Sequence, residues 1–578
     1  MVYREEVMDI KLEFLMGADA IVSSLSVKAG DQVKAGDELL QYEASKGILP
    51  ILAPADGIVE EVLVDQGDRI VLNDVLVRMD TDTVCKEEEA GNRSTPVKKC
   101  REEKTDLLII GAGPGGYEAA IYAAQNGLKV ILAEAKTVGG TCLNEGCIPT
   151  KALNKGARTY QDILKAAKMG IEVPHPQINM PRLIEWKDEV KETLVSGILG
   201  LLKNHSVKLL TGTARFLSGN EVIVEQEEGQ VHVSAANIII ATGSKSAGLR
   251  IPGVQLPQVM DSREALSLKK LPSSITIIGG GVIGMEFAFI YHSLGVSVQV
   301  IEYLEGILPM VDKDISGRLR LIAERKGILI QTGARVSRIE NGLNQEAVVI
   351  YEKDGKEAFA VSEKVLMAVG RVPDYETLNI EAANIETRRD RRGIQVDGHM
   401  QTNRPGIYAI GDVNNILQLA HAASHQGMAA VRHILKMDGG EKQDIVPNVI
   451  FTMPEIASVG KTEMDCQKDG ISYEVYKFPF SGNGKALIMG DTDGFVKLVK
   501  DRVTDEIIGG SIIGPDASTL INSITELVQF HIRQRDASEV IFPHPTTGEA
   551  ISESILGLGV GALHSVNKKE EHIIHAVD

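Results

Sequence analysis

The chain has 578 residues, of which 43% are hydrophobic and 24% are charged, and its formal net charge is −18. Because single hydrophobic cores stop growing near ~250–300 residues, this length predicts several domains. The acidic balance argues against nucleic acid as a partner, since the phosphates would be repelled at every approach.

The N-terminal run MVYREEVMDIKLEF has neither the positive n-region nor the apolar stretch of a secretory signal. No segment approaches the ~18 uncharged apolar residues of a membrane span. Five cysteines among 578 residues are too few for a disulfide-stapled secreted scaffold. We therefore expect a cytoplasmic protein that does not enter membranes, in which a functional cysteine pair is redox-active rather than structural.

Residues 1–80 contain an internal repeat. The run VKAGDQVKAGDELLQYE aligns with VDQGDRIVLNDVLVRMD, which places Gly30 opposite Gly67 and Asp31 opposite Asp68. Each copy alternates apolar and polar residues between turns marked by Gly, Asp or Asn, the pattern of short half-buried strands. One copy is too short to close a core, so we expect the two copies to pack as a small flattened all-β sandwich.

Lys46 lies between the two copies, where a hairpin should expose it. The run from Glu43 to Gly57 resembles a lipoyl domain, whose modified lysine occupies such a hairpin. Biotinyl domains place Met on both sides of the lysine, whereas the neighbours here are Ser45 and Gly47. The resemblance implies lipoate covalently attached to Lys46, and an unmodified surface lysine is the alternative.

Residues 81–104 are polar, charged and poor in apolar side chains, which predicts a flexible linker. Cys85 and Cys100 lie in this segment with no catalytic motif beside them. We interpret both as reduced bystander thiols.

A dinucleotide fingerprint follows in TDLLIIGAGPGGYEAAIYAAQNGLKVILAE, which reads as strand, glycine turn, helix, strand and acid. In such a unit the first glycine permits the tight turn, the second lets a pyrophosphate approach, and the third packs the helix against the strand. The closing acid holds an adenosine ribose. Here the glycines are Gly111, Gly113 and Gly116, and the acid is Glu134.

The unit recurs in ITIIGGGVIGMEFAFIYHSLGVSVQVIE, with Gly279, Gly281 and Gly284 as glycines and Glu302 as the acid. Two complete fingerprints predict two dinucleotides bound at once, most economically a fixed FAD and an exchangeable nicotinamide. Glu302 and Glu305 stand where an enzyme using NADP would need Arg to meet the 2′-phosphate, so we expect NAD.

Cys142 and Cys147 follow the first fingerprint directly, in the run GGTCLNEGCIPTKALN. An opening helical turn there would bring the two sulfurs within bridging distance. The run strongly resembles the redox-active disulfide of the pyridine nucleotide-disulfide oxidoreductases, and the resemblance covers residues 105 to about 565. It implies that Cys142 is the interchange thiol and Cys147 the thiol beside the flavin. A buried structural disulfide is the alternative, which conflicts with a cytoplasmic protein.

Further sequence segments resemble those that contact the cofactors in this family. By resemblance, Asp412 would bond the flavin ribitol, His421 would lie near the flavin ring, and the pair Lys151 and Glu286 would lie near the reactive nitrogen. His421 and His425 have a helical spacing that could hold a metal, but no third ligand presents itself, and we expect no metal. Family blocks also contain the cofactor-binding candidates Thr242, Gly243 and Gly370.

The last region, from about Val446, contains VIFTMPEIASVGKTE and FPHPTTGEA, which resemble the interface domain through which this family forms homodimers. His544 and Glu549 match the catalytic histidine of that domain and the glutamate that follows it. By resemblance, His544 deprotonates a substrate dithiol at the other subunit's disulfide, and Glu549 keeps it in the right tautomer.

We therefore expect an α/β fold with two Rossmann-like dinucleotide-binding domains and an α+β interface domain, preceded by a small all-β lipoyl/biotinyl-type domain. The predicted segments are a lipoyl-like domain (1–80), a linker (81–104), the first part of the FAD-binding domain (105–250), an NAD-binding domain (251–372), a segment completing the FAD-binding domain (373–445) and a dimerisation domain (446–578).

The resemblance implies oxidation of dihydrolipoyl groups with NAD⁺, on partner proteins of a 2-oxoacid, acetoin or glycine-cleavage type complex. The C-terminal tail lacks the cysteine pair of mercuric reductases, and glutathione-type reductases use NADPH. Two alternatives stay open: a lipoyl-bearing carrier or assembly component, and an NADH-dependent reductase of another dithiol.

Overall fold

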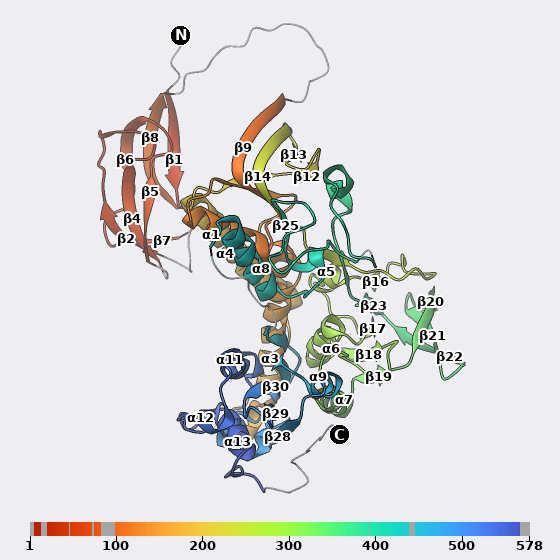
Figure 1. Ribbon diagram of the computed structural model, residues 1–578. Coiled ribbons are helices and arrows are strands. Elements are labelled where there is room, and N and C mark those ends of the chain that lie inside the picture. Colours follow the sequence, from red (N-terminus) through yellow and green to blue (C-terminus); the bar gives the residue numbers. More distant parts are fainter. Residues whose placement is uncertain are drawn as a thin grey trace.

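The computed structural model describes residues 5–12, 20–44, 47–71, 74–82, 99–390, 392–437 and 445–566. Within them a small all-β unit precedes two units built on parallel strands and a C-terminal unit built on an antiparallel sheet (Figure 1). This arrangement confirms the predicted fold class. Lys46 and Cys85 lie outside the described residues.

The N-terminal unit consists of two four-stranded sheets, in the orders β1-β8-β6-β3 and β5-β4-β2-β7. Their inner faces enclose a core of aliphatic side chains, as the alternation of apolar and polar residues predicts. The strands are β1 (Glu5–Lys11), β2 (Ala20–Leu25), β3 (Gln32–Val33), β4 (Glu38–Ala44), β5 (Gly47–Leu52), β6 (Gly57–Val62), β7 (Arg69–Ile70) and β8 (Val75–Asp82).

The internal repeat of this unit has the same turn in both copies. Gly30 and Gly67 have φ of +93° and +96°, a region that favours glycine. The carboxylates of Asp31 and Asp68 each accept a backbone N–H from three residues earlier, at 3.0 and 2.8 Å. The aligned residues are therefore alike because they build the same turn twice.

The first parallel unit has a sheet of order β11-β10-β9-β14-β13-β12, with β25 paired to β14. Helices α1 and α8 pack against each other beside it (Figure 1). Its elements are β9 (Lys99–Ile110), α1 (Pro114–Gln125), β10 (Val130–Glu134), α2 (Gly140–Glu145), α3 (Cys147–Lys165), η1 (Ala166–Met169), α4 (Met180–Asn204), β11 (Lys208–Thr211), β12 (Thr213–Phe216), β13 (Glu221–Gln226) and β14 (Gly229–Ile240), and, after the next unit, η2 (Glu376–Leu378), η3 (Ile380–Ala383), β25 (Ile407–Ala409), η4 (Gly411–Asn414) and α8 (Ala420–Ile434).

Residues 99–104, which the sequence analysis assigns to the linker, form the first half of β9. They pair with residues 229–234 of β14 in the same register as the buried half of the strand. The residues from Arg101 to Lys104 are exposed or half-buried, so this extension has no apolar pattern from which it could be predicted. Its backbone hydrogen bonds, rather than side-chain burial, define the strand.

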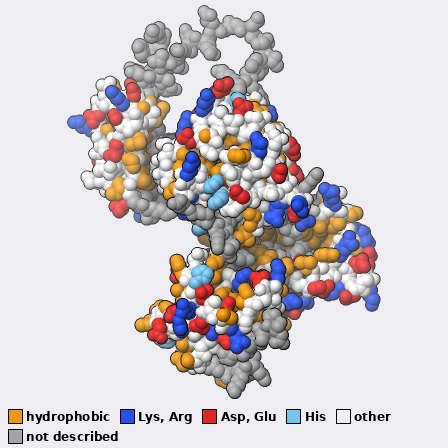
Figure 2. Space-filling view, viewed as in Figure 1, with side chains coloured by type: hydrophobic (Ala, Val, Ile, Leu, Met, Phe, Trp, Pro, Cys, Tyr) orange, Lys and Arg blue, Asp and Glu red, His pale blue; other side chains and the backbone are white. Residues whose placement is uncertain are grey.

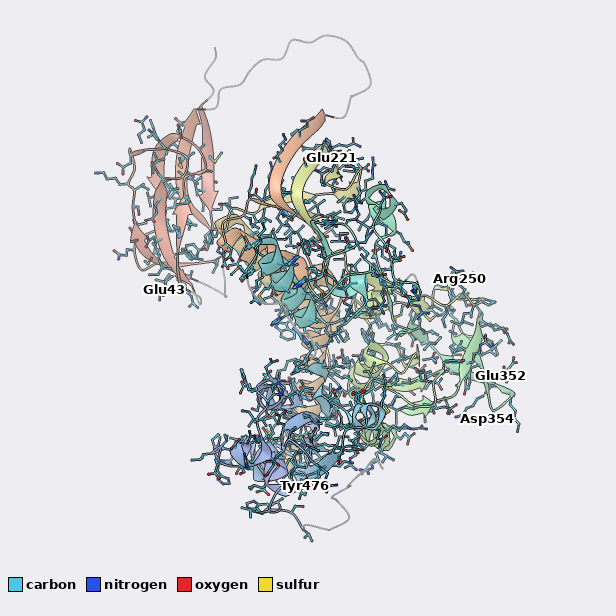
Figure 3. The ribbon with its side chains drawn as sticks, viewed as in Figure 1. Glu43, Glu221, Arg250, Glu352, Asp354 and Tyr476 are labelled. Atoms are coloured by element: carbon cyan, nitrogen blue, oxygen red, sulfur yellow. The ribbon has the colours of Figure 1, made fainter. Side chains whose placement is uncertain are left out.

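The second parallel unit has a five-stranded sheet of order β16-β23-β17-β18-β19. A three-stranded antiparallel sheet extends from it, with Glu352 and Asp354 at its outer end (Figure 3). The elements are β16 (Val259–Met260), α5 (Ser262–Ala265), β17 (Ser274–Ile278), α6 (Val282–Ser293), β18 (Ser297–Ile301), α7 (Lys313–Lys326), β19 (Leu329–Gln331), β20 (Arg335–Asn341), β21 (Ala347–Lys353), β22 (Lys356–Ser362) and β23 (Lys364–Met367), and the pair β15 (Ser244–Ser246) and β24 (Arg371–Pro373) joins the two parallel units.

The C-terminal unit has an antiparallel sheet of order β26-β27-β30-β29-β28, whose core is lined by α11 and α13 (Figure 1). Acidic and basic side chains intermingle over the visible face of the molecule (Figure 2). The elements are β26 (Asn448–Ile450), β27 (Glu455–Gly460), α9 (Glu463–Asp469), β28 (Tyr473–Pro479), η5 (Phe480–Gly482), α10 (Gly484–Met489), β29 (Phe495–Asp501), β30 (Ile507–Gly514), α11 (Ala517–Gln529), α12 (Gln534–Ala537) and α13 (Glu549–Gly557).

Candidate functional site

A cavity of about 2260 Å³ runs past the glycine turns of both parallel units and reaches the C-terminal unit at Asn448 and Phe451. It is large enough for more than one drug-sized ligand. The site residues predicted from sequence that line it are Gly111, Gly113, Gly116, Glu134, Cys142, Cys147, Lys151, Thr242, Gly243, Gly279, Gly281, Glu286, Glu302, Gly370, Asp412 and His421. Gly284, His544 and Glu549 do not line it.

The outer glycines of the first fingerprint are required by packing. Gly111 has φ of +105°, and a Cβ there would lie 2.4 Å from the carbonyl oxygen of Ala241. A Cβ on Gly116 would lie 1.9 Å from the oxygen of Gly111. No side chain fits at either place, so the strand, turn and helix close on each other only with glycine.

The second fingerprint repeats this geometry. A Cβ on Gly279 would lie 2.3 Å from the oxygen of Ala368, and one on Gly284 would lie 1.9 Å from the oxygen of Gly279. Gly284 is thus the counterpart of Gly116, and it packs beneath the turn instead of lining the cavity.

The middle glycine of each turn has open space instead. Around Gly113 the nearest atom to a Cβ would be 4.0 Å away, and around Gly281 nothing lies within 4 Å. Both residues are N-caps, of α1 and α6 respectively, and neither helix has a side chain capping its first N–H groups. Unpaired N–H groups at an uncapped helix N-terminus bind a pyrophosphate, so both turns fit a dinucleotide.

The two acids that close the fingerprints are held in the same way. Glu134 accepts the backbone N–H groups of Ala112 and Lys136, at 2.7 and 2.8 Å. Glu302 accepts those of Gly280 and Leu304, at 2.5 and 2.7 Å. Each carboxylate is therefore fixed beside its glycine turn and lines the cavity, where a ribose would meet it.

Glu305 lies away from this position. Its side chain is exposed, and its carboxylate oxygens lie 3.3 and 3.4 Å from where a Cβ on Gly333 would stand. Glu305 does not line the cavity, whereas Arg335 does. Of the two acids expected to oppose a 2′-phosphate, only Glu302 therefore lines the cavity.

Cys142 and Cys147 are free thiols in hydrogen-bond contact at the cavity wall. Cys142 lies in α2, and Cys147 is the first residue of α3. The hydrogen bond from Cys142 lowers the pKa of Cys147 to about 7, helped by the charge of Lys151 and opposed by burial. The pKa of Cys142 is raised, first because its proton is held in that bond and then by burial. Cys147 is therefore the thiol of the pair that ionises first as the pH rises.

Lys151, one turn further along α3, meets Glu286 of α6. Its Nζ lies 3.1 and 3.0 Å from the two carboxylate oxygens, although the residues are far apart in sequence. The ammonium also lies 4.3 Å from the centre of the Phe451 ring, and the N–H of Phe451 donates to Glu286 at 2.9 Å. The structure thus fixes a cation at the cavity wall beside Cys147.

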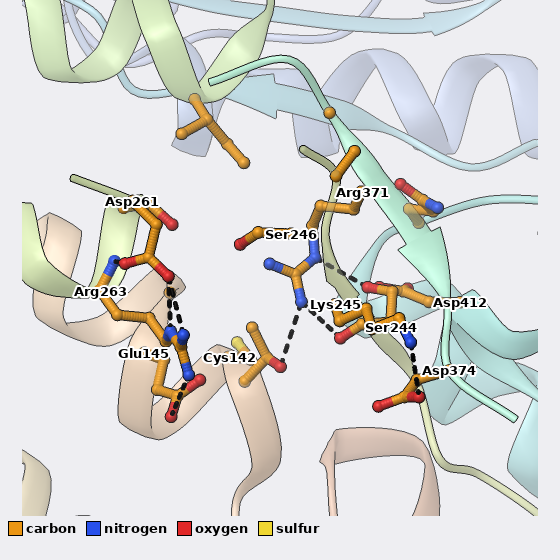
Figure 4. A pocket seen from close by; sticks show the side chains of 18 of the residues that line it. Cys142, Glu145, Ser244, Lys245, Ser246, Asp261, Arg263, Arg371, Asp374 and Asp412 are labelled. Atoms are coloured by element: carbon orange, nitrogen blue, oxygen red, sulfur yellow. Dashed lines mark hydrogen bonds and ion pairs between the residues drawn. The ribbon is translucent and has the colours of Figure 1, made fainter. Parts of the chain in front are cut away.

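Arg371 and Ser244 are site residues that the sequence analysis missed. The Arg371 guanidinium donates to the hydroxyl and carbonyl oxygens of Ser244, at 2.7 and 2.6 Å, and the Ser244 hydroxyl donates to Asp412 at 2.5 Å (Figure 4). Burial raises the pKa of Asp412 against the effects of that bond and of Arg371. Arg371 lies within the block AVGRVP, so its place in a family motif was a signal that could have identified it.

On the facing side of the cavity, Glu145 is the last residue of α2, between the two cysteines (Figure 4). Its carboxylate lies 4.0 Å from a guanidinium nitrogen of Arg263, which forms a closer ion pair with Asp261, at 2.8 Å. Asp261 also caps α5 through its own side chain. This partly exposed contact joins the segment between the cysteines to the second parallel unit.

The buried hydroxyl of Thr242 has no hydrogen-bond partner among the described residues and lies at the cavity wall. Gly243 and Gly370 have φ of +72° and +107°, and a Cβ at either would meet no atom within 4 Å. A donor without a partner beside open backbone fits a polar cofactor, in agreement with the expected FAD site. His421 lies at the same wall, hydrogen-bonded to the carbonyl of Pro447 at 2.7 Å.

His544 and Glu549 form a second centre in the C-terminal unit. His544 Nδ1 lies 2.8 Å from one oxygen of Glu549, whose other oxygen accepts the N–H of Thr546 at 2.9 Å. Although burial would raise the pKa of Glu549, these two bonds lower it. The imidazole side chain is 79% exposed, and its contact with Glu549 uses Nδ1.

Among the described residues, no helix is both long enough and apolar enough to cross a membrane. In the same part of the chain, one carboxylate cluster, of Asp312, Asp314 and Glu463, has the spacing of a metal site. The ammonium of Lys497 already lies 2.6 to 3.0 Å from an oxygen of each carboxylate. This cluster is therefore an ion-pair network.

Comparison with known proteins places three family matches along the chain. Residues 105–427 match the family described as pyridine nucleotide-disulphide oxidoreductase, and residues 446–555 match its dimerisation domain. Residues 16–79 match the biotin/lipoyl family, described as biotin-requiring enzyme.

Similar proteins include the dihydrolipoyl dehydrogenases of Chlamydia muridarum, 41% identical over 78% of this chain and 97% of the relative, and of Bacillus subtilis, 39% identical over 79% and 99%. Among solved structures, the flavoprotein disulfide reductase RclA of Escherichia coli, as its Cu(II) complex, is 29% identical, with a TM-score of 0.71 over 78% of this chain and 99% of RclA. LpdA of Mycobacterium tuberculosis is 25% identical, with a TM-score of 0.73 over 79% and 99%.

Proposed function

We propose that this chain oxidises dihydrolipoyl groups to lipoyl groups with NAD⁺ as the final electron acceptor. The chain belongs to the pyridine nucleotide-disulphide oxidoreductase family, whose members carry out chemistry of this kind. The observation that carries the proposal is the Cys142–Cys147 pair, with one thiol poised as a thiolate, at the wall of a cavity with two dinucleotide turns. The choice of substrate is supported by the names of the relatives and by the match of residues 16–79 to a biotin/lipoyl domain.

In the oxidised enzyme, the first sulfur of the substrate attacks Cys142, the Cys142–Cys147 bond breaks, and Cys147 leaves as a thiolate. The second substrate sulfur then attacks the first, which closes the lipoyl disulfide and releases Cys142 as a thiol. Two electrons therefore pass from the substrate to the cysteine pair. The hydrogen bond from Cys142 and the charge of Lys151 hold the negative charge on Cys147.

FAD, when bound, would supply the two-electron chemistry that links the cysteine pair to NAD⁺. We assign the first glycine turn, Glu134, Thr242 and Asp412 to FAD, and the second glycine turn and Glu302 to NAD. Lys151, paired with Glu286, would place a positive charge beside the flavin of bound FAD, which gains negative charge when it is reduced.

The substrate proton goes to Nε2 of His544 of the partner subunit in a homodimer. Within one chain His544 does not line the cavity that contains the cysteines. Three large apolar side chains of the same C-terminal unit, Ile541, Val560 and Leu563, are 94%, 93% and 74% exposed, as expected of a surface that a second subunit covers. The match of residues 446–555 to a dimerisation domain supports this arrangement.

The test is the oxidation of dihydrolipoamide by the purified, FAD-loaded chain, followed as NADH formation. With the reaction run in reverse, NADH should exceed NADPH in kcat/KM by about 5- to 150-fold, because a 2′-phosphate would meet the carboxylate of Glu302. Glutathione disulfide should be a poor substrate. Absence of dihydrolipoamide oxidation, with turnover of another dithiol, would assign the chain to a different reductase of this family.

Arg335 provides the control for this cofactor preference. It lines the cavity and follows Ala334, whose N–H donates to the backbone oxygen of Glu302 at 2.9 Å. Its guanidinium would attract a 2′-phosphate, so Arg335→Gln should widen the preference for NADH. Equal rates with both cofactors in the wild type and in the variant would contradict the assignment of Glu302.

We propose further that Lys46 carries lipoate and that this arm is a substrate of its own enzyme. Strands β4 and β5 pair antiparallel with Ala44 opposite Gly47, and Lys46 itself lies outside the described residues. Residues 1–80 carry 7 Lys and Arg against 16 Asp and Glu, a net charge of −9. That charge keeps the domain from adhering to an acidic core and leaves it free to visit partner enzymes of a lipoyl-dependent complex.

The experiment is to express the chain with a lipoate ligase, add NADH, and trap new thiols with a mass label. The label should appear on the lipoyl group of Lys46 without added lipoamide, because covalent attachment of the arm to its own enzyme gives effective concentrations on the order of mM. It should be absent from Lys46→Arg and from Cys142→Ser. Labelling that persists in Cys142→Ser would show that the lipoyl group is reduced by another route. An unlipoylated Lys46 would refute the proposal that this lysine carries a lipoyl substrate.

A further inference from the structure

Helix α13 carries two carboxylates that each hold a histidine. Glu549 and Glu553 lie one helical turn apart, so their side chains leave the same face of the helix. Nδ1 of His544 lies 2.8 Å from Oε1 of Glu549, and Nδ1 of His564 lies 2.8 Å from Oε1 of Glu553. The second pair therefore repeats the geometry of the first beside it.

The second pair is held as firmly as the first. Glu553 is 8% exposed, and its other oxygen accepts the N–H groups of Leu563 and His564, at 2.7 and 3.0 Å. In the first pair the corresponding oxygen of Glu549 accepts the N–H of Thr546. Each carboxylate thus binds one imidazole and the backbone of the segment next to it, and each imidazole is largely exposed.

The charges of the two pairs act on each other. The hydrogen bond to Glu553 raises the pKa of His564, followed by the charge of Glu553 and then that of Glu549. Glu549 in turn has both His544 and His564 among the groups that lower its pKa. In the described part of the chain, the charged groups facing His564 are Glu549 and Glu553 on α13, with His544 beyond Glu549.

The other element near His564 is η5, where a Cβ on Gly482 would lie 3.2 Å from the His564 carbonyl oxygen. The residues of η5 are Phe, Ser and Gly, so this element brings no titratable side chain. The charges that act on His564 among these two elements are therefore those of α13.

We propose that Glu553 and His564 form a positioning pair that sets how tightly His544 holds its proton. The inference rests on the proposed role of His544 as the proton acceptor of the reaction. The negative charge of Glu553 favours the imidazolium of His544, and the positive charge of protonated His564 opposes it.

The two members of the pair should have opposite effects when replaced. Glu553→Gln removes a negative charge and keeps an oxygen that can accept the two backbone N–H groups, so His544 should release its proton more easily. His564→Gln removes a positive charge and leaves Glu553 unbalanced, so His544 should hold its proton more tightly. The double variant should lie close to the wild type, because both charges are gone.

The readout is the rate at which diethyl pyrocarbonate acylates His544 in the FAD-loaded full chain, resolved by peptide mass spectrometry over a range of pH. Only the neutral imidazole reacts, so the rate reports protonation of this one residue without a substrate. At a pH where the acylation rate of the wild type still rises with pH, acylation of His544 should be about two- to threefold faster in Glu553→Gln than in the wild type. In His564→Gln it should be about two- to threefold slower. Both effects should shrink at high salt.

His531→Gln is the matched control. His531 Nδ1 lies 3.2 Å from Glu506 in the same unit, and its side chain is 72% exposed, so it is a similar surface pair away from α13. This variant should leave the acylation profile of His544 unchanged. Shifts of the same sign in Glu553→Gln and His564→Gln, or no shift in either, would overturn the positioning pair.

The pH profile of kcat/KM for dihydrolipoamide separates this inference from the proposed function. It should shift in the same directions as the acylation profile. If the acylation profiles shift but the wild type does not turn over dihydrolipoamide, the proposed substrate is refuted and the role of the Glu553–His564 pair is still supported. If the wild type turns over dihydrolipoamide fully but neither profile shifts in the variants, the role of the pair is refuted and the proposed function is still supported.

Discussion

Replacing Cys142 by serine should lower the rate of dihydrolipoamide oxidation by at least about 10⁴-fold. Cys142 is the sulfur that the substrate attacks, and no other thiol of the described residues at the cavity can take its place, because Cys147 faces it from the first turn of α3. A serine hydroxyl cannot form the mixed disulfide through which the electrons leave the substrate. Steady-state NADH formation measures the loss.

The roles of the two cysteines should separate in their spectra. In Cys142→Ser the introduced hydroxyl can still donate to Cys147, and Lys151 stays in place, so Cys147 should remain a thiolate at neutral pH. The FAD-loaded Cys142→Ser chain should therefore show long-wavelength absorbance from this thiolate without any reductant. The absorbance should fade as the pH falls below about 7, where the pKa of Cys147 lies, because the thiolate is then protonated.

Cys147→Ser should also be inactive and should lack this absorbance. If it alone shows the absorbance, the assignment of the two roles is reversed. Cys466→Ser is the matched control: this thiol is fully buried in α9, and burial raises its pKa to about 11, so it takes no part in exchange. That variant should keep its activity.

The parts of the site that the sequence predicts are those built by contiguous residues. The spacing of Gly111, Gly113 and Gly116 dictates a turn whose packing admits no other residue at the first and third positions. The same holds for the cysteine pair, because Cys142 lies in α2 and the break at Gly146 makes Cys147 the first residue of α3, only five residues later. Local motifs of this kind are sufficient because the geometry is determined within a few residues.

Contacts between distant segments were predicted only where a family block named both partners. Lys151 and Glu286 were paired through the resemblance, and the structure brings them together at 3.0 Å. Arg371 lies in a family block, but its partner Ser244 is identified only when β24 pairs with β15 and brings the guanidinium to that serine. His564 lies in a tail without any motif, and its partner Glu553 reads as an ordinary helix residue in the sequence.

A buried ion-pair network between two units is another contact between distant segments that the sequence does not predict. Its loss should have the largest effect on the stability of the protein. Lys497 of β29 is completely buried, and its ammonium lies 2.6 Å from Asp312, 2.9 Å from Asp314 and 3.0 Å from Glu463. The two aspartates belong to the start of α7 in the second parallel unit, whereas Lys497 and Glu463 belong to the C-terminal unit. A lysine inside a β-strand reads as a solvent-facing residue, so sequence alone gives no sign of this network.

Replacing Lys497 by methionine should lower the free energy of unfolding by about 3–5 kcal/mol, because three carboxylates would then face one another with no cation between them. Lys477→Met is the matched control: Lys477 pairs with Asp314 at 2.6 Å but is 34% exposed, so its loss should cost no more than about 1 kcal/mol. Urea unfolding of the FAD-loaded proteins, followed by circular dichroism and flavin fluorescence, measures both. Equal losses in the two variants would show that the buried network contributes no more than a surface pair.

The pH dependence of the Lys497→Met variant distinguishes charge repulsion from lost packing. Burial already raises the pKa of Asp312 in the wild type, against the effect of Lys497, and without the lysine this carboxyl has nothing left to oppose burial. A carboxyl whose pKa is higher in the folded than in the unfolded chain binds protons on folding, so its contribution to stability rises as the pH falls through that range. The gap between variant and wild type should therefore narrow in mild acid. A gap that stays constant with pH would mean that Lys497 stabilises the contact between the two units through the packing of its aliphatic stem and not through its charge.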